Sequence, residues 1–271
     1  MGFTPLMVAA NFNRNPEMIT TLVKEGAEVN AQCAVPILSG MTPLMLAAQN
    51  NPSPEVITAL LKAGADLNAK TPRGATPLLV AGGGNPNPAV INALLKAGAD
   101  VNAATQSGLT PLMDAAANNQ NPDVITALVK AGAKINASNQ NGATALMLAA
   151  EYNQNPHVIT ALVKVGADID TRLPSGKSLL MVIAGNDQSP QVITLLLKAG
   201  ADVNARDKDG ETALTYAAMN SRYPDVITTL LKAGADAKSK DSAGKTAFDY
   251  AQYNTKLQGT DAFRKLEEAS M

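Results

Sequence analysis

The chain has 271 residues, of which 46% are hydrophobic and 17% are charged, and its formal net charge is −1. A balanced charge of this kind argues against a nucleic acid or an anionic membrane surface as a partner, because neither is held without a concentrated basic face. The single cysteine, Cys33, excludes an internal disulfide and a multi-cysteine metal site, and the single histidine, His157, removes the usual histidine-based catalytic arrangements. No apolar run approaches the roughly 18 residues needed to cross a bilayer, so we expect no membrane insertion.

One sequence unit recurs along the chain. It reads approximately G-x-T-P-L-M-L-A-A-x-x-N-x-N-P-x-V-I-T-A-L-L-K-A-G-A-D-V-N-A, and after the first interval its turn glycines are spaced by 34 residues. These glycines, which mark the repeat starts, are Gly2, Gly40, Gly74, Gly108, Gly142, Gly176, Gly210 and Gly244. Because the pattern runs from the first of them to the end, residues 1–271 are predicted to form a single domain of about eight repeats.

The sequence of each repeat predicts a first helix that begins at a threonine and a proline. In the second repeat, Thr42 is a good N-cap, and Pro43 suits the first helical position, where its missing N–H costs nothing. Asn51 follows the Leu-Met-Leu-Ala-Ala run and is expected to end the helix in a left-handed C-cap conformation. The same asparagine recurs at Asn13, Asn85, Asn119 and Asn153.

A second helix is predicted directly after the first. An asparagine or serine precedes a proline, and a V-I-x-x-L stripe at helical spacing follows. The helix ends at a lysine such as Lys62, which lies at the negative end of the helix dipole, and then at a stop glycine such as Gly64. Neither helix can bury its apolar face alone, so neighbouring repeats must stack into one continuous core. The lysines therefore have a structural role, and function must come from the surface.

Thr42-Pro43-Leu44, Ala47-Ala48, Leu60-Leu61 and the run Gly64-Ala65-Asp66-Leu67-Asn68-Ala69 closely resemble the ankyrin repeat family. Tetratricopeptide repeats share the 34-residue period, but their tryptophan signature is absent. The resemblance implies an all-α solenoid of helix-loop-helix repeats with protruding β-hairpin fingers, in which the fingers and first helices line a concave groove.

The chain departs from the family pattern in three ways. The histidine usual after T-P-L is replaced by methionine or leucine, so an apolar contact replaces an imidazole hydrogen bond. The link between the helices carries an extra residue, which resembles bacterial members of the family. Finally, the first repeat lacks a polar capping unit, whereas the last, residues 244–271, ends in a polar segment suited to a cap. These features predict that an amino-terminal segment was removed, and they leave a cytoplasmic and a periplasmic location open.

No enzymatic chemistry is indicated, and we expect no cofactor and no metal. The serines lie in turns and caps, and no nucleophile and base have an interpretable spacing. The run Gly82-Gly83-Gly84 lacks the lysine and strand context of a phosphate loop, so we expect a loosened helix end there. The stretch from Arg206 to Gly210 lacks the remaining ligands of a calcium loop and is interpreted as a charged hairpin tip.

The first candidate binding surface is a set of aromatic and polar residues on the groove side of repeats 5 to 8. Tyrosine is enriched in binding hot spots, and aromatic residues make up only 3% of this chain. The alternative for Tyr250 and Tyr253 is that they cover the end of the solenoid. The candidate residues are Glu151, Tyr152, Tyr216, Met219, Arg222, Tyr223, Tyr250 and Tyr253, with Arg172, Arg206 and Lys208 beside them and Phe12 at the equivalent position of the first repeat.

A second candidate surface is the first finger, which is four residues longer than the others. Its residues Val35, Ile37 and Leu38 either fold back as local packing or offer an apolar contact, and both alternatives stay open. Asp114 replaces an aliphatic residue in the groove. It is either a tolerated exposed polar residue or a specific charge contact.

The function predicted from these features is that of a non-enzymatic, monomeric scaffold, bacterial in origin, that binds a folded protein through its groove and fingers. An alternative is an exported self-protection inhibitor that blocks a hydrolase, such as a periplasmic cell-wall enzyme. A second alternative is the tethering arm of a larger effector.

Overall fold

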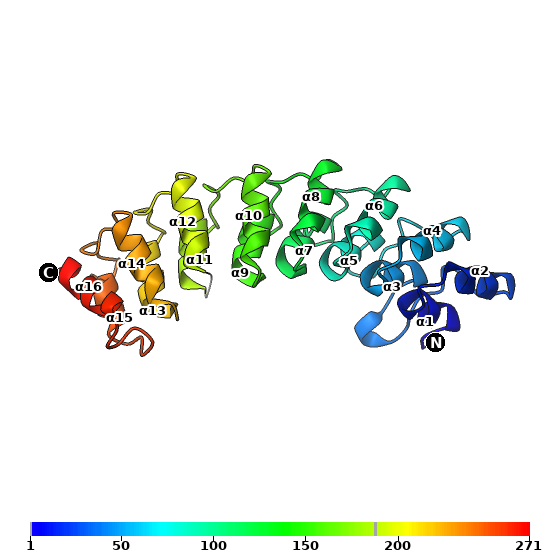
Figure 1. Cartoon of the computed structure of the whole chain (residues 1–271), viewed down its shortest axis with the longest axis horizontal. Coiled ribbons are helices and arrows are strands. Elements are labelled where there is room, and N and C mark those ends of the chain that lie inside the picture. Colours follow the sequence, from blue (N-terminus) through cyan, green and yellow to red (C-terminus); the bar gives the residue numbers. More distant parts are fainter. Residues whose placement is uncertain (1, 187–188) are drawn as a thin grey trace. The chain divides into compact units, whose positions relative to one another are not determined.

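The computed structural model describes residues 2–186 and 189–271. The chain divides into two compact units, Met1–Gln140 and Asn141–Met271, and each is described by itself. Within the described residues both units consist of short helices that follow one another in pairs (Figure 1). No paired strands form there.

The described part of the first unit contains eight α-helices and one short 3-10 helix. The first helix of each pair has an odd number and the second an even number. Their bounds are α1 (Pro5–Phe12), α2 (Pro16–Lys24), η1 (Pro36–Leu38), α3 (Pro43–Asn50), α4 (Pro54–Lys62), α5 (Pro77–Gly84), α6 (Pro88–Lys96), α7 (Pro111–Asn118) and α8 (Pro122–Lys130).

The second unit continues the same alternation. Its helices are α9 (Ala145–Tyr152), α10 (Pro156–Lys164), α11 (Leu179–Gly185), α12 (Pro190–Lys198), α13 (Ala213–Asn220), α14 (Pro224–Lys232), α15 (Ala247–Ala251) and α16 (Asp261–Ser270). The last helix packs against α14 and α15 through the buried Ala262 and Leu266, while its polar face stays exposed.

The predicted helix starts are confirmed. The hydroxyl oxygen of Thr42 accepts a hydrogen bond from the N–H of Met45 at 3.3 Å, and Pro43 occupies the first turn. Asparagine side chains cap α2, α6, α8 and α10 in a similar way, but Ser53, Ser189 and Tyr223 make no such bond. The stop glycines are confirmed too. Gly64 has a φ of +92°, a left-handed conformation that other residues rarely adopt.

The core consists of the apolar positions that recur from one repeat to the next. Leu44 and Met45 of α3 and Ile57 and Leu60 of α4 are fully buried, as are most of their equivalents. The methionine that replaces the family's histidine therefore makes an apolar core contact, as predicted.

In the first five repeats, the asparagine that ends the first helix does not adopt the predicted left-handed conformation. Asn51 and Asn85 have φ values of −86° and −97° in extended backbone, and no described residue other than glycine has a positive φ. The extended conformation turns each side chain toward the preceding repeat. The asparagine is therefore a link between repeats as well as a helix end.

Asn85 shows how this link is made. Its side-chain Nδ2 donates to the carbonyl oxygens of Ala48 at 3.0 Å and Asn51 at 2.8 Å, both in the preceding repeat. Its Oδ1 accepts the N–H of Asn87 at 3.0 Å, at the start of α6. The side chain is buried and uses all of its polar atoms. Asn51 and Asn119 make the equivalent three bonds within the first unit.

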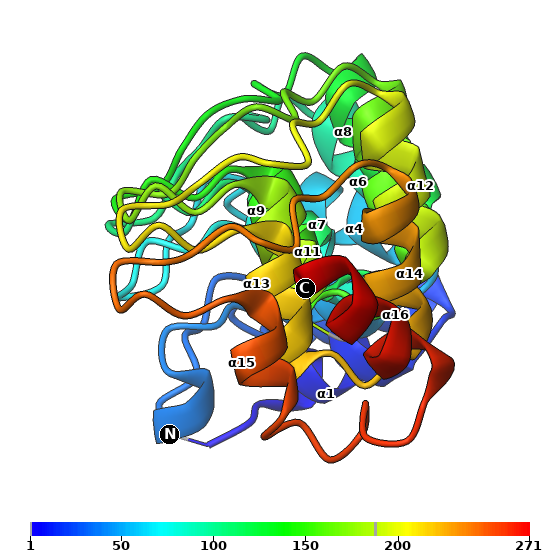
Figure 2. The same ribbon diagram turned by 90° about the vertical axis from the view of Figure 1, so that its left-hand side faces the viewer.

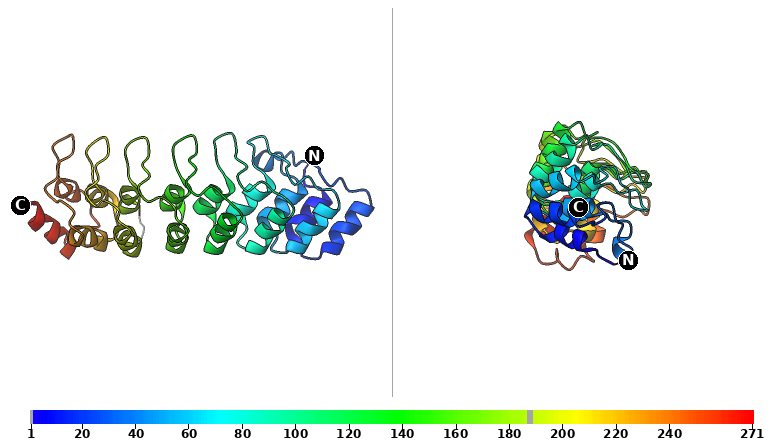
Figure 3. Two further views of the ribbon diagram at one scale, coloured as in Figure 1. Left: turned by 90° about the horizontal axis from the view of Figure 1, so that it is seen from above. Right: turned by 90° about the vertical axis from the view of Figure 1, so that its right-hand side faces the viewer.

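The fingers are tight turns rather than the predicted β-hairpins. In the finger at Gly74, the N–H of Thr71 donates to the carbonyl of Ala75 at 3.0 Å, and no longer ladder forms. Among the described residues the strand-like pairing is limited to isolated bridge residues, such as the pair Arg172 and Ser178. The arms are too short for a ladder. The fingers project to one side of the helices in each unit (Figures 2 and 3).

We expect Asn85→Ala to lower the free energy of unfolding by about 2 to 4 kcal/mol. The substitution removes three hydrogen bonds and leaves two buried carbonyl groups without a donor. Asn13→Ala is the matched control. The side-chain amide of Asn13 donates to none of the described residues, and its Oδ1 accepts a single hydrogen bond, from the N–H of Asn15. Its cost should stay within about 1 kcal/mol. Urea denaturation measures the free energy of unfolding of both variants. Equal losses of stability would contradict the role of Asn85 as a link between repeats.

Candidate functional site

The first finger folds back onto the helices. Val35 and Leu38 pack against a buried apolar cluster formed by Met7, Cys33, Met41, Met45 and Leu46. The finger is closed by main-chain bonds from the N–H of Cys33 to the carbonyl of Met41 and from Gly40 back to Cys33, at 2.9 and 2.8 Å. Its apolar residues are therefore divided between the two predicted roles. Val35 and Leu38 are local packing, whereas Ile37 is 88% exposed.

A cleft of about 410 Å³ opens between the first finger and the next one. Ile37, Leu38 and Met41 line it from the first finger, Arg73 from the second, and Val80 from α5. The remaining lining residues are Pro36, Ser39, Gln49, Thr71 and Pro72. We call this hollow the finger cleft. Its lining combines the apolar side chains of Ile37, Leu38 and Val80 with one cation, Arg73, so it can contact an apolar side chain of a partner.

Arg73 and Gln49 line the cleft although neither was predicted from the sequence to be a site residue. Arg73 lies at the tip of a finger of ordinary length, and Gln49 lies near the end of α3. The pattern carried one usable signal, because these positions vary from repeat to repeat while the framework around them does not.

The glycine run in the third repeat is fully helical. The predicted loosened helix end is wrong, because α5 runs through Gly84 and is as long as α3 and α7. A methyl carbon added at Gly83 would lie 2.4 Å from Oδ2 of Asp114, so the carboxyl group of Asp114 occupies the space beside this glycine. A larger residue at this position would have to displace that carboxyl group.

Asp114 is half-buried on α7. Burial raises the pKa of its carboxyl group, and a hydrogen bond from Nδ2 of Asn118 to Oδ1 at 2.8 Å opposes that rise. The predicted alternative that Asp114 is simply an exposed polar residue is therefore wrong, because the side chain is half-buried. The carboxylate is partly removed from water.

Phe12 does not share the surface of the finger cleft. It is 74% exposed and lines a hollow at the open side of α1 and α2, with Val8, Met18 and Leu22 among its neighbours. Met18 is 41% exposed, whereas the equivalent Val56 is fully buried by the repeat before it. The exposure of this group follows from its position in the first described repeat.

The tyrosines of the second unit form two sets rather than one cluster. Tyr216 and Tyr250 are half-buried, and each donates its hydroxyl hydrogen to the carboxylate of its own finger, Asp207 at 2.8 Å and Asp241 at 2.5 Å. The ammonium group of Lys177 lies 4.3 Å from the ring centre of Tyr216. These two tyrosines therefore fasten fingers to helices.

The other tyrosines lie near the opposite ends of the first helices. Tyr152 is the last residue of α9, Tyr223 precedes α14, and Tyr253 follows α15, and all of them are exposed. We call them the distal tyrosines. Glu151 and Arg222 near them are exposed, and Met219 is half-buried. Because they are exposed, the distal tyrosines are accessible for contact with a partner.

The predicted arginines brace neighbouring fingers. Nη1 of Arg172 donates to the carbonyl of Gly176 at 3.1 Å and of Arg206 at 3.4 Å. Arg206 in turn donates to Oγ of Ser239 at 2.6 Å and to the carbonyl of Lys240. Lys208 is exposed, and its main-chain N–H is bound to the previous finger. The guanidinium groups thus have structural partners within the second unit.

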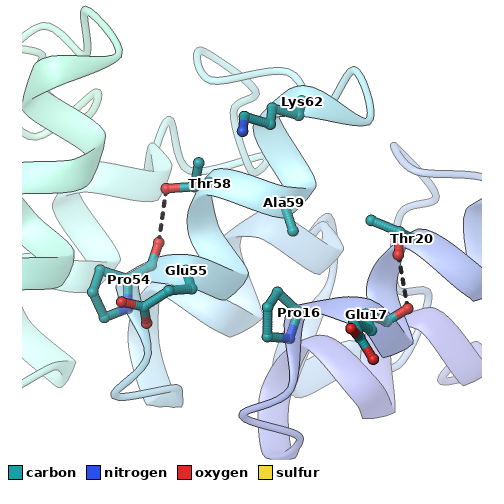
Figure 4. Close-up of a pocket in the computed structure, with 8 residues that line it drawn as sticks. All are labelled: Pro16, Glu17, Thr20, Pro54, Glu55, Thr58, Ala59 and Lys62. Atoms are coloured by element: carbon teal, nitrogen blue, oxygen red, sulfur yellow. Dashed lines mark hydrogen bonds between the residues drawn. The ribbon is translucent and has the colours of Figure 1, made fainter.

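A hollow of about 430 Å³ lies on the other face of the first unit, between α2 and α4 (Figure 4). Pro16, Glu17 and Thr20 line one side, and the other side consists of Pro54, Glu55, Thr58, Ala59 and Lys62. The threonine hydroxyls are bound to main-chain carbonyls of their own helices. A similar hollow lies between α4 and α6, so it is a by-product of the repeat.

Among residues 2–186 and 189–271, no group of three or more histidine, cysteine, aspartate or glutamate side chains is placed to hold a metal ion. None of the helices in that part of the chain is long and apolar enough to cross a membrane.

The family model for ankyrin repeats, described as three copies, matches residues 6–105, 78–173, 150–241 and 180–266. The chain belongs to the ankyrin repeat family. Its structure is similar to the crystal structure of the human ASB11 ankyrin repeat domain, with 27% sequence identity and a TM-score of 0.73, over 85% of this chain and 98% of that one. No curated protein matches the chain. Ankyrin repeats are typically non-enzymatic scaffolds that bind folded proteins.

The two roles of the first finger predict different costs of truncation. Leu38→Ala should lower the free energy of unfolding by about 1 to 2 kcal/mol, because it removes packing from the buried cluster. Ile37→Ala should stay within about 0.5 kcal/mol, since that side chain is exposed. Urea denaturation compares the pair, and a larger loss for Ile37 would reverse the assignment.

Tyr216→Phe should cost about 1 kcal/mol of stability through the lost hydrogen bond to Asp207. Tyr253→Phe is its control, because that side chain is 81% exposed. Thermal melting of the two variants measures the difference. If both melt like the parent protein, the fastening of the finger by its tyrosine is not significant.

The bond between Tyr250 and Asp241 predicts a dependence on pH. It lowers the pKa of the Asp241 carboxyl group and raises the pKa of Tyr250 to about 12. An acid whose pKa is lowered by folding stabilises the protein above its unfolded value of about 4 and loses that contribution as the pH falls further. Tyr250→Phe should therefore melt with a weaker dependence on pH below about 4. An unchanged slope would contradict this prediction.

Proposed function

We propose that this protein is a scaffold that binds a folded protein through the side of each unit formed by the first helices and the fingers. The observation that carries this proposal is the distribution of departures from the 34-residue pattern. Framework positions are buried or bound to neighbouring repeats, whereas several non-repeating residues on this side are available to a partner.

In the first unit, the residues that depart from the 34-residue pattern lie next to one another. The lengthened first finger forms the finger cleft with Gln49 and Val80. A methyl carbon added at Gly84 would meet Gln49, and one added at Gly83 would meet Asp114. The cleft, the glycines and the carboxylate therefore form one continuous surface, which we call the unit 1 face.

In the second unit the distal tyrosines support the proposal. An exposed tyrosine supplies a large, rigid contact area and a hydroxyl group, which is why tyrosines are frequent among the residues that dominate binding energy. Tyr216 and Tyr250 are weaker candidates, because their hydroxyl groups already serve the fingers.

A narrower form of the proposal is that the partner is a hydrolase whose cleft receives the first finger. The exposed Ile37, held at the tip of a finger that is itself packed on the core, favours this form. A firmly held finger loses little conformational entropy when it is inserted.

The test compares four tagged proteins as baits in lysate from the source cells. They are the parent chain, Ile37→Ser with Arg73→Glu on the unit 1 face, Tyr152→Ala with Tyr223→Ala and Tyr253→Ala, and an outer-face control with Glu55→Ala and Lys62→Ala. A partner should be retained by the parent and the control and lost from one face variant.

Affinity for the partner, once purified, should fall about thirtyfold for each central contact, which corresponds to about 2 kcal/mol. A hydrolase that loses activity at a one-to-one ratio would support the narrower form. Retention of every captured protein by all four baits would refute the proposal.

A further inference from the structure

Two departures from the repeat pattern meet in space on the unit 1 face. The positions equivalent to Asp114 in the first three repeats are aliphatic, namely Val8, Leu46 and Val80. The positions equivalent to Gly83 in the neighbouring repeats are Gln49 and Ala117. A methyl carbon at Gly83 would lie 2.4 Å from Oδ2 and 2.7 Å from Cγ of Asp114. The glycine thus makes room for the carboxylate of the next repeat.

The carboxylate of Asp114 is incompletely satisfied. Asn118 donates one hydrogen bond to Oδ1. No ion pair connects Asp114 with any lysine, arginine or histidine in the described part of the chain, and no nearby charge contributes to its pKa. Its place in the first turn of α7 offers some favourable interaction with the helix dipole. Burial nevertheless outweighs these contributions and raises the pKa.

A partly desolvated carboxylate without a cation costs stability, whereas an aliphatic residue such as Val80 in the preceding repeat does not. The complement that removes this cost is a cationic side chain. Arginine fits best, because its guanidinium is weakly hydrated, donates several hydrogen bonds in one plane and follows an apolar stem. Val80 lies one helical turn before Gly83 and Gly84 and lines the finger cleft, so an apolar surface for that stem adjoins the carboxylate.

We propose that Asp114 is the binding site for an arginine side chain that the partner inserts between the finger cleft and Gly83. This inference deepens the proposed function and rests on it for the identity of the ligand as part of a folded protein. Asp114 is thus a recognition residue kept at the expense of folding stability.

The experiment uses butylguanidinium chloride as the probe and the amide resonances of Gly83 and Gly84 in two-dimensional NMR spectra as the readout. Ionic strength is held constant with sodium chloride, and neutral butylurea serves as the control ligand. In the parent chain the probe should shift both resonances to saturation, while butylurea should leave them unchanged. Asp114→Asn should weaken the binding of the probe by roughly tenfold, since it removes a charge-assisted contact.

A second variant keeps the charge but displaces it. Gly83→Ala places a carbon where the carboxylate now lies, so it should weaken the binding of butylguanidinium as well. Absence of saturable shifts in the parent chain, or equal affinity in Asp114→Asn, would overturn the proposal. Because the probe is a small molecule, this titration succeeds or fails independently of the search for a folded partner.

The stability of Asp114→Asn separates a functional loss from misfolding. A carboxyl group whose pKa is raised by folding contributes less stability as the pH rises from its unfolded value of about 4 through its folded value. Asp114→Asn should therefore melt at a higher temperature than the parent at pH 7, and the difference should vanish below about pH 4. A variant that binds the probe weakly because it has unfolded would melt at a lower temperature.

Discussion

The buried asparagine that ends the first helix of the second, third and fourth repeats is the interaction on which the repeat framework of the first unit depends. Its amide donates to two carbonyl groups of the preceding repeat, and its oxygen accepts the N–H that opens the next helix. One side chain thus ends a helix, starts another and holds two repeats in register. Since all of its polar atoms are used in a buried place, substitution costs both the bonds and the satisfaction of the partners.

This framework leaves the finger side of each unit free to vary. The apolar core is formed by the same positions in successive repeats, so a change on the exposed side of one repeat does not disturb the stack elsewhere. The first unit uses that freedom for a longer finger, a glycine run and a carboxylate. The second uses it for exposed tyrosines, although two other tyrosines and two arginines of that unit became braces for the fingers.

Asp114 and Asp241 show how neighbouring groups give one side chain two roles. Asp241 accepts bonds from Tyr250 and from the main-chain N–H groups of Ala243 and Lys245, so its charged form is stabilised and its pKa is lowered. Asp114 receives one bond while it packs against Gly83, so its charged form is penalised and its pKa is raised. The first carboxylate is structural. The second is the one that gains from an external cation.

The sequence by itself determined the repeat length, the helix starts at Thr42-Pro43 and the stop at Gly64, because caps and left-handed glycines act within a few residues of the chain. It also determined the family. Only the tertiary structure decided that Asn85 reaches into the preceding repeat, that Leu38 is packed while Ile37 is exposed, and that Tyr216 holds a finger. Gly83 and Asp114 likewise meet only because α5 packs against α7. Contacts between repeats join residues about 34 positions apart, and a local pattern contains no information about which of them touch.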